Sequence, residues 1–417
     1  MNSNQAPVHT GDISRWPGIL LAALLLVPAV LLSPAILEEH LALDWRAGDM
    51  RHVAYGLQLL FGALSVTTFL ARRRAALAMA RLLRNRRRLF AGLFLVTIST
   101  LVAIGLSEAV LRIVDLPFRE LRSPPEYQRA QFDSETGWSY LPDTALDVEF
   151  HAVETPIPVY TDSRGIRVGA PGQSPDTARP SILFVGGSYT FGAGLSYEDT
   201  LPGQMERLPD FPLQPVNLGV EAYGTDQSLL RLKRFIDVFN TRVVVYSFIP
   251  DHVNRNANYD RRELIRGARF KGTKPLFALE ADGMPYLSKA PRLYEDYHYS
   301  RLWAFVRLFW QRWGPGPRQE LTRGLIREMN RLAESRGATL IVVDWNWDRP
   351  AAGSPIAALT REGIHLVDTA RNAPPGWIRW WNNGWNIPDD SHPNAKANAR
   401  IARLVYEQMK QLNLVGP

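Results

Sequence analysis

Three uncharged apolar runs near the N-terminus constrain this chain of 417 residues more than any other feature. They are Gly18–Leu37, Val53–Ala71 and Leu89–Ser107. Each holds roughly 20 residues, and a helix of that length crosses about 30 Å of hydrocarbon. The first run has a single arginine, Arg15, ahead of it and no good cleavage site after it, which favours a retained span over a signal peptide. The sequence therefore predicts three membrane-spanning helices.

The connectors between these runs predict how the chain is oriented. Residues 72–88 contain eight arginines and no acidic residue, whereas residues 38–52 contain four acidic residues and two arginines. Basic connectors stay on the cytoplasmic side of a membrane. We therefore expect a cytoplasmic N-terminus and an extracytoplasmic location for everything after about Arg112. In a Gram-negative cell this describes an inner-membrane protein with a periplasmic domain.

The positive charge of the chain is concentrated in this membrane part. Residues 1–117 hold 12 Arg or Lys against 7 Asp or Glu, while the whole chain carries a formal net charge of +7. The rest is nearly neutral, so the charge fits contact with a lipid bilayer and argues against nucleic-acid binding. The absence of cysteine excludes disulfides, thiolate metal sites and a cysteine nucleophile. We expect neither a metal nor another cofactor.

The residues after the membrane anchor (residues 1–117) fall into two parts. Residues 118–180 show little helical periodicity and predict a β-rich lead-in and linker, with strand candidates at Val148–Phe150 and Ile157–Tyr160. In residues 181–417 short apolar strands alternate with helices, which predicts an α/β domain with a mainly parallel sheet. The expected strands are Ile182–Val185, Val216–Leu218, Val243–Phe248, Thr339–Trp345 and Ile364–Val367, and the expected helices are Thr200–Leu208, Gln227–Phe239, Glu320–Arg336 and Ala395–Leu412.

Ser188 is the first candidate for chemistry. It follows Gly186 and Gly187 directly after the first of these strands, where ligands of such sheets bind. Neighbouring glycines let the backbone turn sharply, and the Ser188 N–H is placed to help hold an oxyanion. Glycine and serine are also common in plain strand-to-helix turns, so this motif alone is equally compatible with a structural turn.

The second candidate is the pair Asp389 and His392, just before the last helix. A serine hydroxyl needs a base, and an imidazole has a suitable ordinary pKa near 6.5. A carboxylate three residues earlier can bond one ring nitrogen and leave the other for the serine. Helix capping is the alternative explanation for the aspartates, but it gives no reason for the histidine.

Taken together, these blocks resemble the SGNH/GDSL hydrolase superfamily, in the same order, over about residues 180–412. The resemblance implies a flavodoxin-like three-layer α/β/α domain. It also implies that Ser188 is the nucleophile, His392 the general base and Asp389 its orienting carboxylate. Gly219 matches the glycine whose N–H donates to the oxyanion hole. Asp390 is a weaker alternative to Asp389, because it is only two residues from the histidine.

One block departs from the family pattern. After its third strand the family carries Asn–Asp, and the asparagine is the third oxyanion donor, whereas this chain has Pro250–Asp251. Losing such a donor typically costs about 3 kcal/mol of transition-state stabilisation. His252 and Asn254 are the nearest substitutes, and His252 is slightly favoured. A purely structural histidine in a loop is an equally good explanation for it.

Aromatic residues supply candidates for substrate binding. Nine of the twelve tryptophans lie between Trp303 and Trp385. Flat aromatic faces beside a hydrolytic site stack on sugar rings, and tryptophan is also enriched in binding surfaces and at membrane interfaces. The candidates for contacting the substrate are Tyr189, Trp345, Trp381 and Trp385.

Three functions are compatible with these features. The first is an esterase that removes an O-acyl group, in particular acetyl, from an envelope glycan or glycolipid through an acyl-enzyme on Ser188. The second is an O-acyltransferase for a cell-surface polysaccharide, which would need a membrane partner that supplies the acyl donor. The third is a non-catalytic glycan-binding scaffold, suggested by the missing asparagine.

Overall fold

The computed structural model describes residues 16–31, 48–74, 77, 86–113, 129–150, 153–259, 272–293, 300–303, 305–306, 318–346, 354–372, 384–388 and 390–415. The chain divides into two compact units. The first is Met1–Pro117 with Tyr299–Gly314, and the second is Phe118–His298 with Pro315–Pro417.

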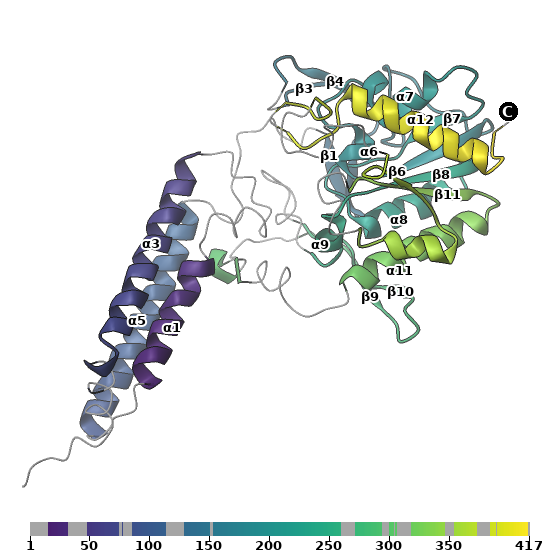
Figure 1. Ribbon diagram of the computed structural model, residues 1–417. Helices are drawn as coiled ribbons and strands as arrows, with labels where there is room; N and C mark the ends of the chain where they lie inside the picture. Colours follow the sequence, from purple (N-terminus) through teal and green to yellow (C-terminus); the bar gives the residue numbers. More distant parts are fainter. Residues whose placement is uncertain are drawn as a thin grey trace, which may run out of the picture. The chain divides into compact units, whose positions relative to one another are not determined.

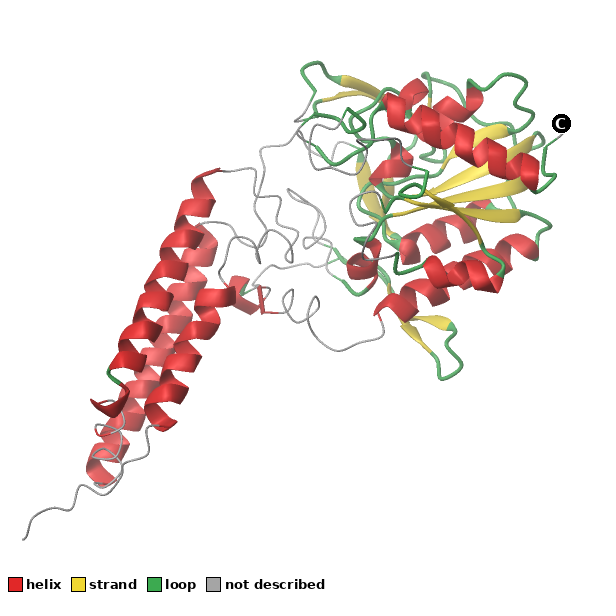
Figure 2. Cartoon of the chain, viewed as in Figure 1, coloured by secondary structure: helices red, strands yellow, loops and turns green. Residues whose placement is uncertain are grey.

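Among the residues that the structure describes, the first unit contains three long helices, α1 (Trp16–Leu31), α3 (Gly48–Leu70) and α5 (Arg86–Ile113), drawn in Figure 2. Helices α1 and α3 contact each other, and Ser65 Oγ donates a hydrogen bond of 2.8 Å to the Ala22 carbonyl.

The helices that correspond to the three predicted spans differ in length and in how far they are apolar. Among the described residues, one helix, Phe90–Ile113, is long and apolar enough to cross a membrane, and its side chains are exposed. The described helix α1 has 16 residues, and the apolar part of α3 is confined to Gln58–Leu70, because charged residues lie in its first turns. The first two spans therefore stay predictions.

An eight-stranded sheet forms the centre of the second unit. Its strand order is β12 (His365–Asp368), β11 (Thr339–Asp344), β8 (Asn240–Phe248), β6 (Pro180–Gly186), β7 (Gln214–Asn217), β5 (Arg167–Val168), β4 (Ile157–Thr161) and β3 (Ala145–Val148). The strands from β12 to β7 are parallel, and those from β5 to β3 are antiparallel. The predicted α/β class with a mainly parallel sheet is confirmed.

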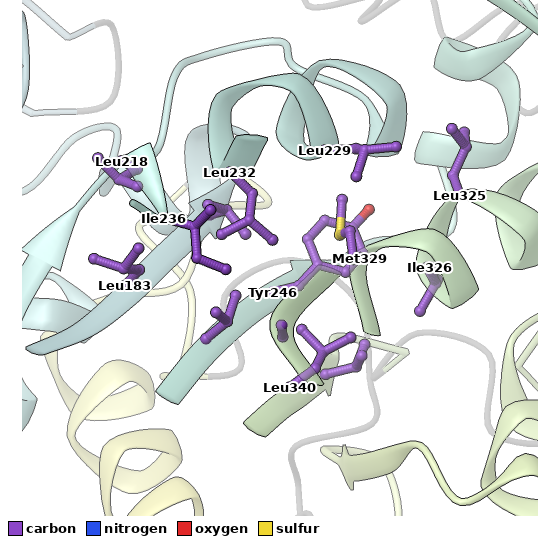
Figure 3. Close-up of a cluster of buried hydrophobic side chains, with 14 of the residues drawn as sticks. Leu183, Leu218, Leu229, Leu232, Ile236, Tyr246, Leu325, Ile326, Met329 and Leu340 are labelled. Carbon is purple, nitrogen blue, oxygen red and sulfur yellow. The ribbon is translucent and has the colours of Figure 1, made fainter. Parts of the chain in front are cut away.

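Helices cover both faces of this sheet (Figure 1). On one face α8 (Thr225–Phe235) and α11 (Arg318–Glu334) pack on the strands, and on the other face α7 (Leu201–Glu206) and α12 (Ala395–Gln411) do so. Strands β6 and β8 lie between these layers and are buried along almost their whole length. This is why their sequences are continuously apolar instead of alternating. Figure 3 shows the side chains on the α8 and α11 side, from Leu183 to Leu340.

The predicted lead-in is not separate from the α/β domain, because β3, β4 and β5 extend the same sheet. Arg167 in β5 is 1% exposed, and its guanidinium donates to the carbonyls of Phe191 and Gly192. These carbonyls belong to α6 (Ser188–Phe191) and its C-cap. Through these hydrogen bonds the lead-in holds in place the short helix that begins at the candidate nucleophile.

A buried ion pair fixes a further segment to α8. Residues 272–293 carry the hairpin of β9 (Leu276–Leu279) and β10 (Pro285–Lys289). Lys274 lies just ahead of β9, and its ammonium bonds the Asp226 carboxylate, with both side chains fully buried. The same ammonium donates to the carbonyls of Asn258 and Pro275, so its three hydrogens are all used.

We expect Asp226→Ala to lower the free energy of unfolding of the second unit by about 3–5 kcal/mol, because it leaves the Lys274 charge buried without a partner. Urea unfolding followed by tryptophan fluorescence measures this change. The matched control is Asp237→Ala, which breaks the exposed pair with Arg336 and is expected to change stability far less. Equal effects of the two substitutions would contradict the role assigned to the buried pair.

Candidate active site

Ser188, His392 and Asp390 form a hydrogen-bonded chain in the second unit. Ser188 Oγ lies 2.8 Å from His392 Nε2. His392 Nδ1 lies 2.5 Å from Asp390 Oδ1. The carboxylate accepts from Nδ1, which leaves the Nε2 lone pair for the serine hydroxyl. This is the arrangement of a serine-hydrolase triad, with the serine 8% exposed and the aspartate buried.

The prediction of Asp389 as the orienting carboxylate is corrected to Asp390. Asp390 Oδ1 accepts both the backbone N–H of His392, at 2.8 Å, and the ring Nδ1–H. An aspartate that bonds the backbone two residues on is an Asx turn, and this turn brings the carboxylate to the ring at the shorter spacing. Asp389 lies outside the described residues. With Nδ1 bonded to Asp390 and Nε2 to Ser188, the ring has no nitrogen left for it.

The turn between β6 and α6 positions the nucleophile. Gly186 has φ +155°, and a Cβ there would lie 2.2 Å from Thr190 Oγ1, so only glycine fits. Thr190 Oγ1 in turn donates to the Val185 carbonyl at 3.3 Å. Ser188 is the first residue of α6, and the first N–H groups of a helix have no partner within it. Its N–H is therefore available to an oxyanion.

The predicted oxyanion role of Gly219 is corrected. Its N–H donates to Asn217 Oδ1 at 3.0 Å and is not available to a substrate. Asn217 Nδ2 bonds the Phe191 carbonyl at 3.3 Å, so the same side chain ties β7 to α6. A Cβ on Gly219 would lie 2.3 Å from Phe191 N. Glycine is needed here because the strand end and α6 approach closely.

Sequence reasoning missed Ala222, which lies in the turn after Gly219. Its φ is +62°, in the left-handed region that residues with a Cβ rarely adopt. Within the part of the chain that the structure describes, its N–H has no hydrogen-bond partner. Strained backbone of this kind clusters at active sites. The only signal in the sequence is the position, five residues after the end of the parallel strand β7.

His252 lies at the start of α9 (His252–Asn256) and is fully buried. Its Nδ1 lies 2.7 Å from Tyr246 Oη. A Cβ built on Gly187 would come within 3.4 Å of its Nε2, so the ring reaches the residue before the nucleophile. Asn254, the other substitute for the missing asparagine, is half-buried on the same short helix.

Two of the four aromatic candidates for substrate contact are corrected. Trp345 is 1% exposed at the end of β11, and Tyr189 is buried against it, with ring centroids 5.4 Å apart. Tyr189 Oη donates to the Ser391 carbonyl at 2.7 Å, so both rings support the histidine loop. Trp385 is half-buried with Lys396 Nζ 4.1 Å above its ring, and Trp381 lies outside the described residues.

The described segments contain no candidate metal site. No group of three or more His, Cys, Asp or Glu residues there is placed to hold a metal ion.

Comparison with known proteins finds similarity only among solved structures. No family model matches the sequence, and no curated protein matches it. A protein described as lipolytic, of the G-D-S-L family, from Desulfitobacterium hafniense is 12% identical, covers 56% of this chain and 99% of its own, and has a TM-score of 0.34. An acylhydrolase from Bacteroides fragilis is 15% identical, and the match covers 58% of this chain and 92% of the acylhydrolase, with a TM-score of 0.33. The psychrotrophic esterase EstA from Pseudoalteromonas sp. is 12% identical, and the match covers 57% of this chain and 98% of EstA, with a TM-score of 0.31.

The hydrogen-bonded arrangement of Ser188, His392 and Asp390 is the feature of the molecule that bears on function.

We expect Asp390→Ala to lower kcat for ester hydrolysis by about 10³–10⁴-fold, because the histidine loses the carboxylate that fixes its tautomer. The matched control, Asp389→Ala, is expected to change kcat less than about tenfold, since neither ring nitrogen of His392 is left for that residue. Initial rates with p-nitrophenyl acetate measure both. A larger loss at Asp389 than at Asp390 would restore the original sequence prediction.

Proposed function

We propose that this chain is an SGNH-type serine esterase that works through an acyl-enzyme on Ser188. The observation that carries the proposal is the hydrogen bond of 2.8 Å between Ser188 Oγ and His392 Nε2, with Asp390 on the other ring nitrogen. A serine in a purely structural turn would not require a hydrogen bond to a histidine that lies 204 residues away in the sequence. The complete triad also makes a purely scaffolding role less favourable.

The reaction follows from this geometry. His392 Nε2 takes the hydroxyl proton as Ser188 Oγ bonds the ester carbonyl carbon, and Asp390 stabilises the imidazolium that forms. The tetrahedral intermediate then expels the alcohol, which receives the proton from His392. A water molecule repeats the attack on the acyl-enzyme with His392 as base, and the acid leaves while the serine regains its proton.

Backbone donors are available for the oxyanion of this intermediate. The Ser188 N–H is open at the start of α6, and we assign the second backbone donor to Ala222 in place of Gly219. The turn that carries Ala222 adjoins the nucleophile, because a Cβ on Gly187 would lie 3.2 Å from the Tyr223 carbonyl oxygen. Preorganised donors of this kind supply a large share of acyl-transfer catalysis.

The substrate we propose is a short O-acyl ester, in particular an acetyl ester, on an envelope glycan or glycolipid. A cavity of about 10 Å³, room for roughly one water molecule, is lined by Phe150 and Phe191. Phe150 also packs edge-on against the His392 ring, with centroids 5.9 Å apart, so the cavity and the triad share this neighbour, although none of the triad residues lines the cavity. The glycan assignment is supported by the tryptophans near Trp385, which precede the triad loop.

We also propose that the first unit anchors the enzyme in the inner membrane, with a cytoplasmic N-terminus and the catalytic unit in the periplasm. The apolar helix Phe90–Ile113 and the arginine-rich connector at residues 72–88 support this orientation. Transfer of the acyl group to a polysaccharide hydroxyl uses the same acyl-enzyme and stays the second function, with a membrane partner as acyl donor.

We expect the full chain in detergent to release p-nitrophenol from p-nitrophenyl acetate and to gain the mass of one acetyl group on Ser188. Ser188→Ala is expected to abolish both, because it removes the nucleophile. Intact-mass and peptide mass spectrometry after rapid acid quenching measure the adduct. Release by Ser188→Ala at the original rate would exclude this mechanism, and turnover only with an added glycan hydroxyl would favour transfer.

We expect kcat/KM for p-nitrophenyl acetate to exceed that for the octanoate by at least about tenfold, because the cavity lined by Phe150, which packs on the His392 ring, has room for only about one water molecule. The butyrate provides an intermediate point in the same assay. A specificity constant that rises with chain length would contradict the short-acyl assignment and leave the triad assignment intact.

A further inference from the structure

His252 is a buried histidine beside the nucleophile that the triad does not use. Its Nε2 is buried and has no hydrogen-bond partner among the residues the structure describes. We propose that His252 carries its single proton on Nε2 and donates it to the oxyanion that forms when Ser188 attacks. It would thereby replace the asparagine that is missing at Pro250. This inference rests on the proposed esterase function.

The proton's position follows from a network that begins at Asn256. The Asn256 Oδ1 accepts the backbone N–H of Thr225 at 2.8 Å, which fixes the orientation of the amide. Its Nδ2 therefore faces two hydroxyls, Thr225 Oγ1 at 3.0 Å and Thr322 Oγ1 at 2.9 Å. An amide nitrogen only donates, so both hydroxyls accept from it. Thr322 passes its own hydrogen to the Arg318 carbonyl at 2.9 Å.

The direction of the next two bonds is then determined. Tyr246 Oη and Thr225 Oγ1 are two hydroxyls 2.8 Å apart, and either of them can donate to the other. Because Thr225 Oγ1 already accepts from Asn256 Nδ2 at 3.0 Å, we direct its own hydrogen at Tyr246 Oη. Tyr246 in turn donates to His252 Nδ1 at 2.7 Å. The opposite direction would point the Tyr246 hydrogen at Thr225 and leave the Thr225 hydrogen unpaired in a buried site, which is unfavourable.

The ring therefore has one proton, and it is on Nε2. Burial lowers the pKa of His252 well below its ordinary value of 6.5, and the nearby positive charge of Arg255 lowers it further, against the smaller opposing effect of Asp251. The ring is neutral at pH 7 and protonated on one nitrogen only. Since Nδ1 accepts from Tyr246, the remaining nitrogen, Nε2, is a donor without a partner.

The His252 Nε2–H group lies close to the nucleophile, where an oxyanion donor is needed. A Cβ on Gly187 would lie 3.4 Å from His252 Nε2 and 3.3 Å from Arg255 Nη1. Gly187 immediately precedes Ser188, whose own N–H is the first of α6 and has no partner within that helix. The donor is thus held by a rigid network at the turn from which the nucleophile projects. Such a preorganised donor in a site that excludes water stabilises developing negative charge.

The role assigned to His252 involves no transfer of its proton. When Ser188 Oγ bonds the carbonyl carbon, the π electron pair moves to oxygen and the serine proton goes to His392. His252 Nε2–H hydrogen-bonds that oxygen and keeps its proton throughout. Tyr246 is a positioning residue, which acts by holding the Nε2–H tautomer.

Substitution of His252 tests the inference through kcat. We expect His252→Ala to lower kcat for p-nitrophenyl acetate by about 10²–10³-fold with KM nearly unchanged, because the donor acts in the transition state. His252→Gln places an amide N–H near the same point and is expected to recover part of the loss. Tyr246→Phe is expected to lower kcat less than His252→Ala does. A kcat for His252→Ala equal to that of the parent chain would overturn the inference.

A matched variant separates this effect from a loss of packing. Thr241→Val removes a buried hydroxyl at the opposite end of β8 from Tyr246, and we expect it to leave kcat unchanged. A fall in kcat in Thr241→Val as large as that in Tyr246→Phe would show a general effect of stability and would contradict the positioning role.

The tautomer can be observed directly. The chain has eight histidines, so selective ¹⁵N-histidine labelling of the full chain in detergent gives few signals, and His252→Gln identifies the one from His252. We expect protonated Nε2 and unprotonated Nδ1 at pH 7, and the opposite tautomer would overturn the inference.

Acetylation of Ser188 distinguishes a failure of this inference from a failure of the proposed function. If Ser188 is acetylated but the His252 tests fail, only the inference is lost. If Ser188 is never acetylated, the proposed function itself fails.

Discussion

The two hydrogen bonds of the His392 ring are the constraint on which the catalytic unit depends. One ring nitrogen meets Ser188 and the other meets Asp390, at 2.8 and 2.5 Å. The serine belongs to the turn after β6, whereas the other two residues belong to the loop before α12. Tyr189 joins the two segments through its hydrogen bond to the Ser391 carbonyl. The packing of α12 on the sheet therefore decides whether the imidazole reaches the serine.

Much of this framework could be predicted from the sequence. Strands buried on both faces need continuous apolar runs, and β6, β8 and β11 show such runs within a few residues of their observed bounds. Because a parallel sheet places its ligands beyond the carboxyl ends of its strands, Ser188 could be singled out, and His392 was recognisable beside a helix start. The structure brings these two residues together.

The remainder depends on backbone geometry that spacing does not encode. The choice between Asp389 and Asp390 depends on an Asx turn, which lets the nearer aspartate reach the ring. Gly219 is required for close approach to α6, and its N–H is used by Asn217. Likewise, aromatic residues near a site look alike in sequence whether they face a substrate or, like Trp345, fill the core.

In the proposed reaction Ser188 attacks an ester while its own N–H and His252 hold the oxyanion. The most direct test is a crystal structure of the full chain after reaction with a methylphosphonate ester, whose tetrahedral phosphorus takes the place of the attacked carbon. We expect phosphorus bonded to Ser188 Oγ, with the phosphoryl oxygen about 2.7–3.1 Å from Ser188 N and His252 Nε2. An adduct on another residue, or a phosphoryl oxygen that faces away from both donors, would contradict it.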